Sequence, residues 1–150
     1  MQMRNILADF GLKAMNKAHQ AVLRLSGGRV LSRAFGMSVV ELHTIGRKSG
    51  RDRVTMLTSP IIEAERIVLV ASKGGDARNP DWVSNLVDHP DVVVVMDGRP
   101  RAMHARVATE EERTTLWPRV VDAYRGYAGY QRRTARQIPL VICESLPTTG

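Results

Sequence analysis

The stretch "MSVVELHTIGRKSGRDRVTMLTSPII", residues 37–62, contains two predicted β-strands joined by a turn. Residues 37–45 and 53–62 are rich in β-branched and other apolar residues, which favour extended backbone. The segment between them, "GRKSGR", has two glycines that allow a tight turn. Pro60 lies near the end of the second strand, where it indicates a sheet edge or a bulge. The stretch therefore predicts a strand pair whose connecting turn is strongly cationic.

The remainder of the chain continues this pattern of short strands and adds helices between some of them. Apolar runs of strand length predict further strands at 66–72, 91–96, 101–108 and 138–144. Helices are predicted over 80–89, with Asn79 as N-cap, over 110–123, where Thr109 and Glu112 form a capping box, and over 124–136. Because most neighbouring strands are joined by hairpins, we predict an α+β fold. Its barrel-like sheet has five to six mostly antiparallel strands, with flanking helices.

The composition indicates a basic, single-domain protein. The chain has 150 residues, enough for one hydrophobic core, and a formal net charge of +7. Arginine outnumbers lysine by 18 to 4, and guanidinium groups suit phosphate and carboxylate ligands. This charge favours an anionic partner: nucleic acid, an anionic membrane surface, or a phosphorylated or polycarboxylate ligand. The single cysteine, Cys143, excludes an internal disulfide and favours the reducing cytoplasm.

The N-terminal region carries most of the excess charge. Residues 1–33 contain six Lys or Arg residues and one acidic residue, and their apolar residues recur at helical spacing. Two interpretations stay open: a basic amphipathic helix that touches anionic lipid, or a surface helix packed on the domain. We divide the chain into an N-terminal helix and linker, 1–30, and one domain, 31–150. No apolar run reaches the length of a membrane span, so we expect a cytoplasmic protein, with a peripheral membrane contact through 1–25 as the open alternative.

Two loops of similar composition follow predicted strands. The turn 46–51 holds Arg47, Lys48 and Arg51, and "ASKGG", at 71–75, again combines serine, lysine and glycine. A single cationic turn is most often solvated, and it is also compatible with a nucleic-acid patch. Glycines that let backbone N–H groups approach a ligand, together with cationic side chains, are equally typical of phosphate binding. Two such loops at strand ends favour one shared anionic ligand.

The three tyrosines of the chain, Tyr124, Tyr127 and Tyr130, fall on one face of the predicted helix at 124–136. They could pack into the core, but glycines between them and arginines around them favour the lid of a pocket. There a phenol can contact a flat ligand and donate a hydrogen bond. The four histidines and Cys143 show no metal-ligand spacing, and no hydrolase nucleophile motif occurs. We therefore predict a ligand pocket and no metal site.

Seven segments carry a family resemblance, in order along residues 37–146: "LHTIGRKSGRDR", "VLVASKGG", "NPDWVSNL", "DHPDVVV", "ARVATEEER", the tyrosine triplet and "RQIPLVICE". Together they resemble the deazaflavin-dependent nitroreductase family, also described as quinone reductases that use the reduced deazaflavin coenzyme F420. The resemblance implies a split β-barrel of the FMN-binding type. It also implies a coenzyme with a phosphodiester and a polyglutamate tail, whose negative charge would explain the cationic loops.

The resemblance further implies roles for individual residues. Arg47, Lys48, Ser49 and Arg53 would hold the phosphate and carboxylates, and further coenzyme contacts would come from Val54, Met56, Leu57, Ala71, Ser72, Lys73, Trp82, Asn85 and Tyr127. Tyr124, Tyr127 and Tyr130 would face the substrate as catalytic residues, with Ser72 near the reacting carbonyl or nitro group. The family pattern has a proline and then an aromatic residue after the arginine at 53. Met56 and Thr58 stand on that strand instead, which indicates a change in substrate preference rather than in coenzyme binding.

These implications define the function that we expect. It is an oxidoreductase that transfers a hydride from reduced coenzyme F420 to a quinone-like, activated-alkene or nitroaromatic acceptor. Because such a cofactor carries the chemistry, the protein needs neither a nucleophile nor a metal. The alternatives are a non-catalytic carrier of deazaflavin, lipid or fatty acid at the membrane, and, less favoured, a basic nucleic-acid-binding domain. Nucleic-acid binding would lose affinity steeply with salt. The oligomeric state and the physiological acceptor are not predicted by the sequence.

Overall fold

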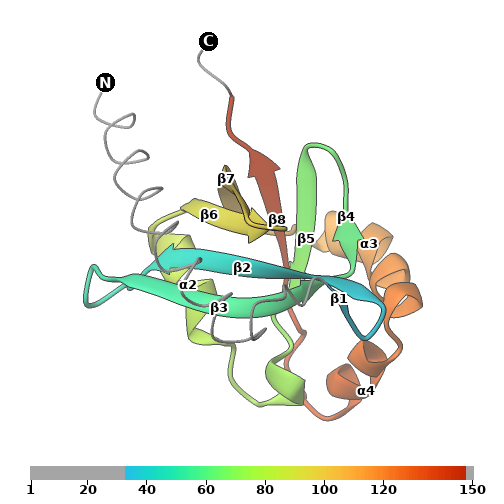
Figure 1. Ribbon diagram of the computed structural model, residues 1–150. Helices are drawn as coiled ribbons and strands as arrows, with labels where there is room; N and C mark the ends of the chain where they lie inside the picture. Colours follow the sequence, from blue (N-terminus) through green and yellow to red (C-terminus); the bar gives the residue numbers. More distant parts are fainter. Residues whose placement is uncertain (1–32, 148–150) are drawn as a thin grey trace.

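The computed structural model describes residues 33–147, so the predicted N-terminal helix and its membrane contact lie outside the described residues. Within these residues the chain forms eight strands, a short 3-10 helix and three α-helices, which follow one another along the sequence (Figure 1). Their bounds are β1 Arg33–Ala34, β2 Met37–Ile45, β3 Asp52–Ser59, β4 Ile61–Ile62, β5 Arg66–Val70, η1 Lys73–Gly75, α2 Asp81–Asp88, β6 Asp91–Met96, β7 Arg99–Val107, α3 Glu110–Ala123, α4 Gly126–Arg132 and β8 Leu140–Ser145.

All strands belong to one antiparallel sheet in the order β1-β2-β6-β7-β8-β5-β4, with β3 paired to β2. The whole of β3 pairs with β2, from Ser59 opposite Ser38 to Asp52 opposite Ile45. β3 and β5 lie close to each other without pairing, because the sheet is curled. The predicted antiparallel, barrel-like sheet is confirmed, and the predicted strands correspond to its longer members.

Local signals fixed several elements well. β2, β6 and α3 have the predicted bounds, and the capping box of α3 is present: the Thr109 hydroxyl accepts from the Glu112 backbone N–H, and the Glu112 carboxylate accepts from the Thr109 N–H. The prediction of one strand over 53–62 was wrong at Pro60, where β3 ends and β4 begins. There the Ser59 hydroxyl bonds the carbonyls of Ile61 and Val68, so the chain turns.

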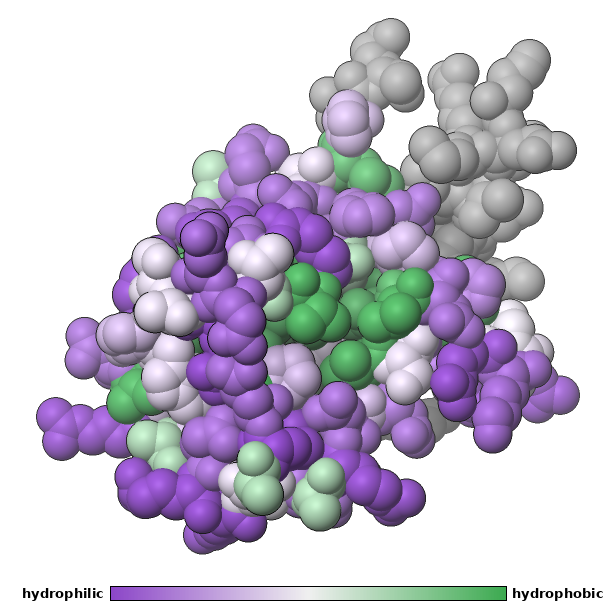
Figure 2. All heavy atoms as spheres, turned by 180° about the vertical axis from the view of Figure 1, so that it is seen from behind, coloured by the Kyte–Doolittle hydropathy of each residue, from purple (hydrophilic) through white to green (hydrophobic). Residues whose placement is uncertain are grey.

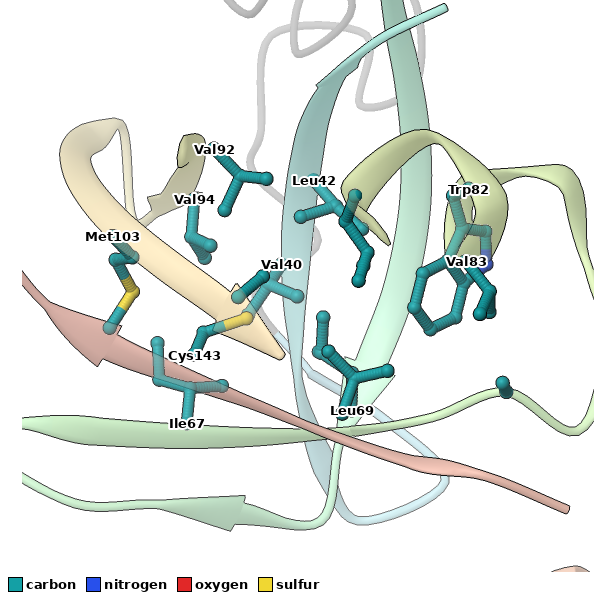
Figure 3. Packing of buried hydrophobic residues seen from close by; sticks show 14 residues of the cluster. Val40, Leu42, Ile67, Leu69, Trp82, Val83, Val92, Val94, Met103 and Cys143 are labelled. Carbon is teal, nitrogen blue, oxygen red and sulfur yellow. The ribbon is translucent and has the colours of Figure 1, made fainter. Parts of the chain in front are cut away.

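The start of α2 also differs from the prediction. Asn79 is not its N-cap: Pro80 holds that position without a side-chain hydrogen bond, and the Asn79 Oδ1 atom accepts instead from Arg136 Nη1 at 2.7 Å. α2 packs its buried face against the sheet, and Figure 3 shows Trp82 and Val83 of this helix beside core residues of β2 and β5. Most of this core comes from the strands: Val40, Leu42, Ile67, Leu69, Val92, Val94, Met103 and Cys143.

A second apolar cluster holds α3 and α4 against β4, β5 and β8. It contains Leu116 and Val120 of α3, Tyr127 of α4, and Val68, Val70, Leu140 and Ile142 of the sheet. Figure 2 shows that the face opposite the view of Figure 1 is mostly hydrophilic, around a smaller hydrophobic area. No helix within the described residues is both long and apolar enough to cross a membrane. The two clusters therefore fix α2 and α4, the helices that flank the candidate site.

Candidate functional site

Two adjoining pockets form one groove across β3. The aromatic pocket, of about 520 Å³, is lined by Phe35, Val39, Thr55, Met56, Leu57, Thr58, Val70, Ser72, Lys73, Gly74, Pro80, Trp82, Tyr124, Tyr127 and Tyr130. The polar pocket, of about 660 Å³, is lined by Gly46, Arg47, Lys48, Ser49, Asp52, Arg53, Val54, Thr55, Asp81, Trp82, Ser84 and Asn85. Thr55 and Trp82 belong to both linings, so the two pockets lie side by side.

The cationic turn is held in place by its backbone rather than by its charges. Gly46 N–H donates to the Arg51 carbonyl at 2.7 Å, and Gly50, with φ of +68°, donates to the Gly46 carbonyl at 2.9 Å. The Arg47 N–H donates to Asn85 Oδ1 at 2.9 Å, and Asn85 Nδ2 reaches Thr44 Oγ1 at 3.3 Å. Since Asn85 lies on α2, this buried amide ties the turn to the helix and orients the turn toward the polar pocket.

The cations of the polar pocket have no carboxylate partners within residues 33–147. In the described part of the chain, no carboxylate oxygen lies within 4 Å of the charged groups of Arg47, Lys48 and Arg53, although Asp52 and Asp81 also line the pocket. Arg53 Nη2 only approaches the Ser49 hydroxyl, at 3.4 Å. Three exposed cations that line one pocket and form no ion pair with its carboxylates repel one another, so they favour an anionic ligand in this pocket.

Arg106, on β7, shows the opposite arrangement. Its guanidinium is paired with both oxygens of Glu112, at 2.7 and 2.8 Å, and with Glu144 at 3.0 Å. The hydrogen bonds from Arg106, followed by the one from the Thr109 backbone N–H, hold the pKa of Glu112 down to about 2. Arg106 is thus neutralised within the fold, whereas Arg47, Lys48 and Arg53 remain available to a ligand.

The second predicted loop lies at the aromatic pocket. Lys73, Gly74 and Gly75 all have positive φ, of 45°, 63° and 87°. A Cβ at position 75 would lie 2.8 Å from the Tyr130 carbonyl oxygen and 2.9 Å from Arg133 Cβ, so only glycine fits against α4. This close approach places Ser72 and Lys73 in the pocket wall beside the tyrosine helix, and Figure 1 shows η1 between α2 and α4.

The tyrosines form one aromatic cluster. The ring centroids of Tyr124 and Tyr127 are 5.2 Å apart in an edge-to-face arrangement, and Tyr130 lies 6.3 Å from Tyr124 and 6.1 Å from Tyr127. Phe35, 72% exposed, stacks on Tyr124 with centroids 5.3 Å apart. Such contacts fix the rings relative to one another. The pocket therefore offers a preformed aromatic wall.

The three hydroxyl groups differ in their availability. Tyr127 is 5% exposed, and its hydroxyl already contacts Thr58 Oγ1 at 3.2 Å and Met37 Sδ at 3.6 Å. Burial raises the pKa of Tyr127, partly offset by the hydrogen bond with Thr58. Tyr124 and Tyr130 are half-buried, and their hydroxyl oxygens are 3.5 Å apart. The hydrogen bond with Tyr130 raises the pKa of Tyr124, so this phenol also stays protonated near neutral pH.

The structure brings all but one of the predicted site residues to the groove. Arg47, Lys48, Ser49, Arg53, Val54 and Asn85 line the polar pocket, Met56, Leu57, Ser72, Lys73 and the tyrosines line the aromatic pocket, and Trp82 lines both. Ala71 lies in the core with no exposed surface, whereas its neighbours Val70 and Ser72 line the aromatic pocket.

Sequence reasoning missed Phe35, Val39 and Thr55, which also line the groove. Thr58 was noted only as a departure from the family pattern, yet it contacts the Tyr127 hydroxyl. The apolar run at 37–45 predicted a strand containing Val39, but no signal in the sequence paired that strand's start with a helix near residue 127.

Comparisons with solved structures define the class of protein. A structure described as an F420-H2 dependent reductase, FDR-A, matches at a TM-score of 0.64 and 38% identity, covering 71% of this chain and 93% of that one. A structure described as a domain-swapped dimer matches at a TM-score of 0.68 and 33% identity, covering 91% of this chain and 98% of that one. The curled antiparallel sheet is thus a split β-barrel of the kind found in F420-dependent reductases, as predicted.

Sequence comparisons identify the family. A family model described as "F420H(2)-dependent quinone reductase" matches residues 15–145. An F420H(2)-dependent quinone reductase of Mycobacterium tuberculosis is 34% identical over 130 residues, covering 84% of this chain and 87% of that protein. A putative member of the same species is 41% identical over 96 residues, or 64% of this chain and 80% of the relative. The chain belongs to the F420H(2)-dependent quinone reductase family.

Family membership confirms the predicted class of function. The chain is an F420H(2)-dependent oxidoreductase, and its cofactor is coenzyme F420. The family evidence supports the enzyme over the carrier and the nucleic-acid-binding domain.

Proposed function

We propose that the protein transfers a hydride from reduced coenzyme F420 to a quinone-like acceptor held in the aromatic pocket, and that activated alkenes and nitroaromatics are further acceptors. The observation that carries this proposal is that the two pockets adjoin each other and share Thr55 and Trp82. A ligand that occupies both would contact, at one end, cations without a carboxylate partner in the described chain and, at the other end, a preformed aromatic wall.

The residues of the polar pocket fit the anionic part of the coenzyme. Arg47, Lys48 and Arg53 would hold its phosphodiester and carboxylates, since guanidinium and ammonium groups form charge-assisted hydrogen bonds with both. Asn85 serves mainly to orient the turn, because its amide is already hydrogen-bonded to Arg47 and Thr44. Trp82 and Lys73 would line the path of the coenzyme toward the aromatic pocket.

The aromatic pocket supplies what a hydride acceptor needs from the protein. Bound coenzyme supplies the hydride, so the chain must orient the acceptor and stabilise the negative charge that arrives on its oxygen. The Tyr124 and Tyr130 hydroxyls are the best placed donors, because Tyr127 is buried and already contacts Thr58. The Ser72 hydroxyl forms no side-chain hydrogen bond with another described residue, so it too can donate to the acceptor.

A flat, mainly apolar acceptor suits the lining. Val39, Met56, Leu57 and Val70 provide apolar contact, and Met56 is 40% exposed. Thr58, on the strand where the family pattern has an aromatic residue, lines the pocket and contacts the Tyr127 hydroxyl. The unbranched Met56 side chain can adapt to rings of different size. We therefore favour quinones with a substituent beside the ring over compact nitroaromatics.

The cellular setting of this reaction remains part of the proposal. We propose a cytoplasmic enzyme whose residues 1–25 touch an anionic membrane, supported by the basic, amphipathic pattern of that segment. A lipid-soluble quinone would then be within reach of the aromatic pocket. Co-sedimentation with anionic and neutral vesicles, for the full chain and a chain lacking 1–25, tests this contact. Equal recovery of both forms with anionic vesicles would contradict it.

Fluorescence titration with coenzyme F420 and with flavin mononucleotide tests the function itself. We expect the deazaflavin to bind in the micromolar range or tighter, and the reduced form to be oxidised by menadione with the rate following protein concentration. Binding without turnover of any quinone, alkene or nitroaromatic would favour the carrier. Absence of deazaflavin binding would overturn the proposal.

A further inference from the structure

Arg136 joins the two walls of the aromatic pocket although it lines neither pocket. It lies in the segment between α4 and β8, half-buried. Its guanidinium donates to the Ala71 carbonyl at 3.2 Å, the Ser72 carbonyl at 3.0 Å and the Asp76 carbonyl at 2.8 Å. A further bond runs to Asn79 Oδ1, at 2.7 Å. All four acceptors belong to the loop that carries Ser72 and Lys73.

The loop that accepts the hydrogen bonds of Arg136 has an unfavourable backbone conformation. Lys73 has a φ of 45°, and left-handed backbone at a residue with a side chain costs about 1 kcal/mol or more. Such a conformation persists only where the surrounding structure holds it. Arg136 bonds carbonyls on both sides of the left-handed run at 73–75, which is the placement that a clamp requires.

The other side of Arg136 is anchored to the tyrosine helix. Its carbonyl accepts from Gln131 Nε2 at 2.7 Å, and Gln131 Oε1 accepts from the Ile138 N–H at 2.9 Å and from Arg113 Nη2 at 3.1 Å. Gln131 belongs to α4, next to Tyr130. A movement of Arg136 would therefore change the spacing between the η1 loop and the tyrosines.

We propose that Arg136 is a positioning residue that fixes the Ser72–Lys73 loop against the tyrosine helix and so sets the affinity of the groove for the deazaflavin coenzyme. This inference rests on the proposed function. Every acceptor of its side chain is an uncharged oxygen atom of one loop, so the role of Arg136 is orientation rather than charge pairing. Arginine suits this role because its planar fork can bond several acceptors at once, which lysine cannot.

Arg136→Met tests the inference against Arg132→Met, a matched loss of charge. Arg132 is exposed on α4, and its side chain has no hydrogen bond within the described residues. Two readouts are needed: the Kd of coenzyme F420 by fluorescence, and hydrogen exchange of residues 72–79 in the ligand-free protein. For Arg136→Met we expect Kd to rise about tenfold, because charge-assisted hydrogen bonds order the loop, and exchange at 72–79 to accelerate. For Arg132→Met we expect neither change beyond about twofold.

A merely structural role predicts a different pattern. Arg136→Met would then lower Tm while the folded protein kept the wild-type Kd and the wild-type exchange at 72–79, and this result would overturn the inference. If Arg136→Met does not fold, Arg136→Lys keeps the charge and loses most of the bonds. An unchanged Kd in Arg136→Lys would likewise count against the inference. Failure of the wild-type chain to bind the coenzyme would instead overturn the proposed function.

Discussion

The polar and aromatic pockets share Thr55 and Trp82 but are built in opposite ways. In the aromatic pocket the functional groups are bonded to one another: the tyrosine rings are packed edge to face, and the Tyr127 hydroxyl contacts Thr58. In the polar pocket the backbone of the turn is fixed, whereas its cationic side chains have no carboxylate partner in the described chain. We therefore expect the polar pocket to contribute mainly to coenzyme affinity and the aromatic pocket to contribute mainly to the orientation of the acceptor.

The largest expected effect is on affinity. Lys48→Ala combined with Arg53→Ala should raise the Kd of coenzyme F420 about 100-fold, because each side chain is expected to form a charge-assisted hydrogen bond with the anionic tail. Fluorescence titration measures this change, and kcat at saturating coenzyme should fall far less. The matched control is Arg99→Ala, an exposed cation of the β6–β7 hairpin that lines neither pocket. Equal Kd values for the double variant and this control would place the anion site elsewhere.

A smaller effect, on turnover, is expected in the aromatic pocket. Tyr130→Phe should lower kcat about tenfold while the Kd of the coenzyme stays within about twofold, because the hydroxyl stabilises charge that appears only during transfer. Tyr127→Phe is the internal control: its hydroxyl is buried against Thr58 and Met37, so kcat should fall less. Steady-state kinetics with menadione measures kcat for both variants. A larger kcat loss in Tyr127→Phe would assign the donor role to Tyr127.

The hydrogen bond between Thr58 of β3 and Tyr127 of α4 should contribute to the free energy of unfolding. Thr58→Val removes the partner of the Tyr127 hydroxyl and should lower the free energy of unfolding by about 1 kcal/mol, the usual contribution of one hydrogen bond. Urea denaturation measures this loss. Thr58→Ser retains the hydroxyl and should recover most of it. If both variants were as stable as the wild type, the hydrogen bond would have no energetic role.

The smallest effect expected is on the pH dependence. The pKa of Tyr124 is raised by its hydrogen bond with Tyr130, and that of Tyr127 is raised by burial, both from an ordinary value of 10. A raised pKa favours the protonated phenol, so the Tyr124 hydroxyl persists as a donor as the pH approaches 10. Loss of the Tyr124 proton should therefore not lower kcat between pH 7 and about 9.5. A decline centred near pH 8.5 that disappears in Tyr124→Phe would contradict the assignment.

The sequence predicted those parts of the molecule that depend on local signals. The apolar runs of β2 and β6 and the capping box of α3 each determine an element from adjacent residues. Asn79 shows where this reasoning fails: its side chain had a good local role as an N-cap, but Arg136, 57 positions away, uses the same oxygen. Tertiary contacts decided between the two.

In the candidate site, too, the features with a local sequence signal were predicted and those that depend on tertiary contacts were not. The cationic turn, the "ASKGG" loop and the tyrosine triplet were visible as motifs, and the structure places them around one groove. Thr58 and Tyr127, which are in contact, are 69 positions apart in the sequence. Arg136 is up to 65 positions away from the residues that accept its hydrogen bonds. No local pattern could therefore indicate these contacts. Ala71 was assigned to the site with its neighbours, although its side chain is buried in the core.

We propose that the polar pocket binds the anionic tail of the coenzyme while the aromatic pocket receives the reacting ring. The most direct measurement compares the Kd of coenzyme F420 with that of its deazaflavin fragment lacking phosphate and glutamates, in the wild type and in the Lys48→Ala/Arg53→Ala variant. We predict that the wild type binds the full coenzyme at least about 50-fold more tightly, and that the double variant loses most of this preference. Equal affinity of the wild type for both ligands, or the same preference in both proteins, would contradict the claim.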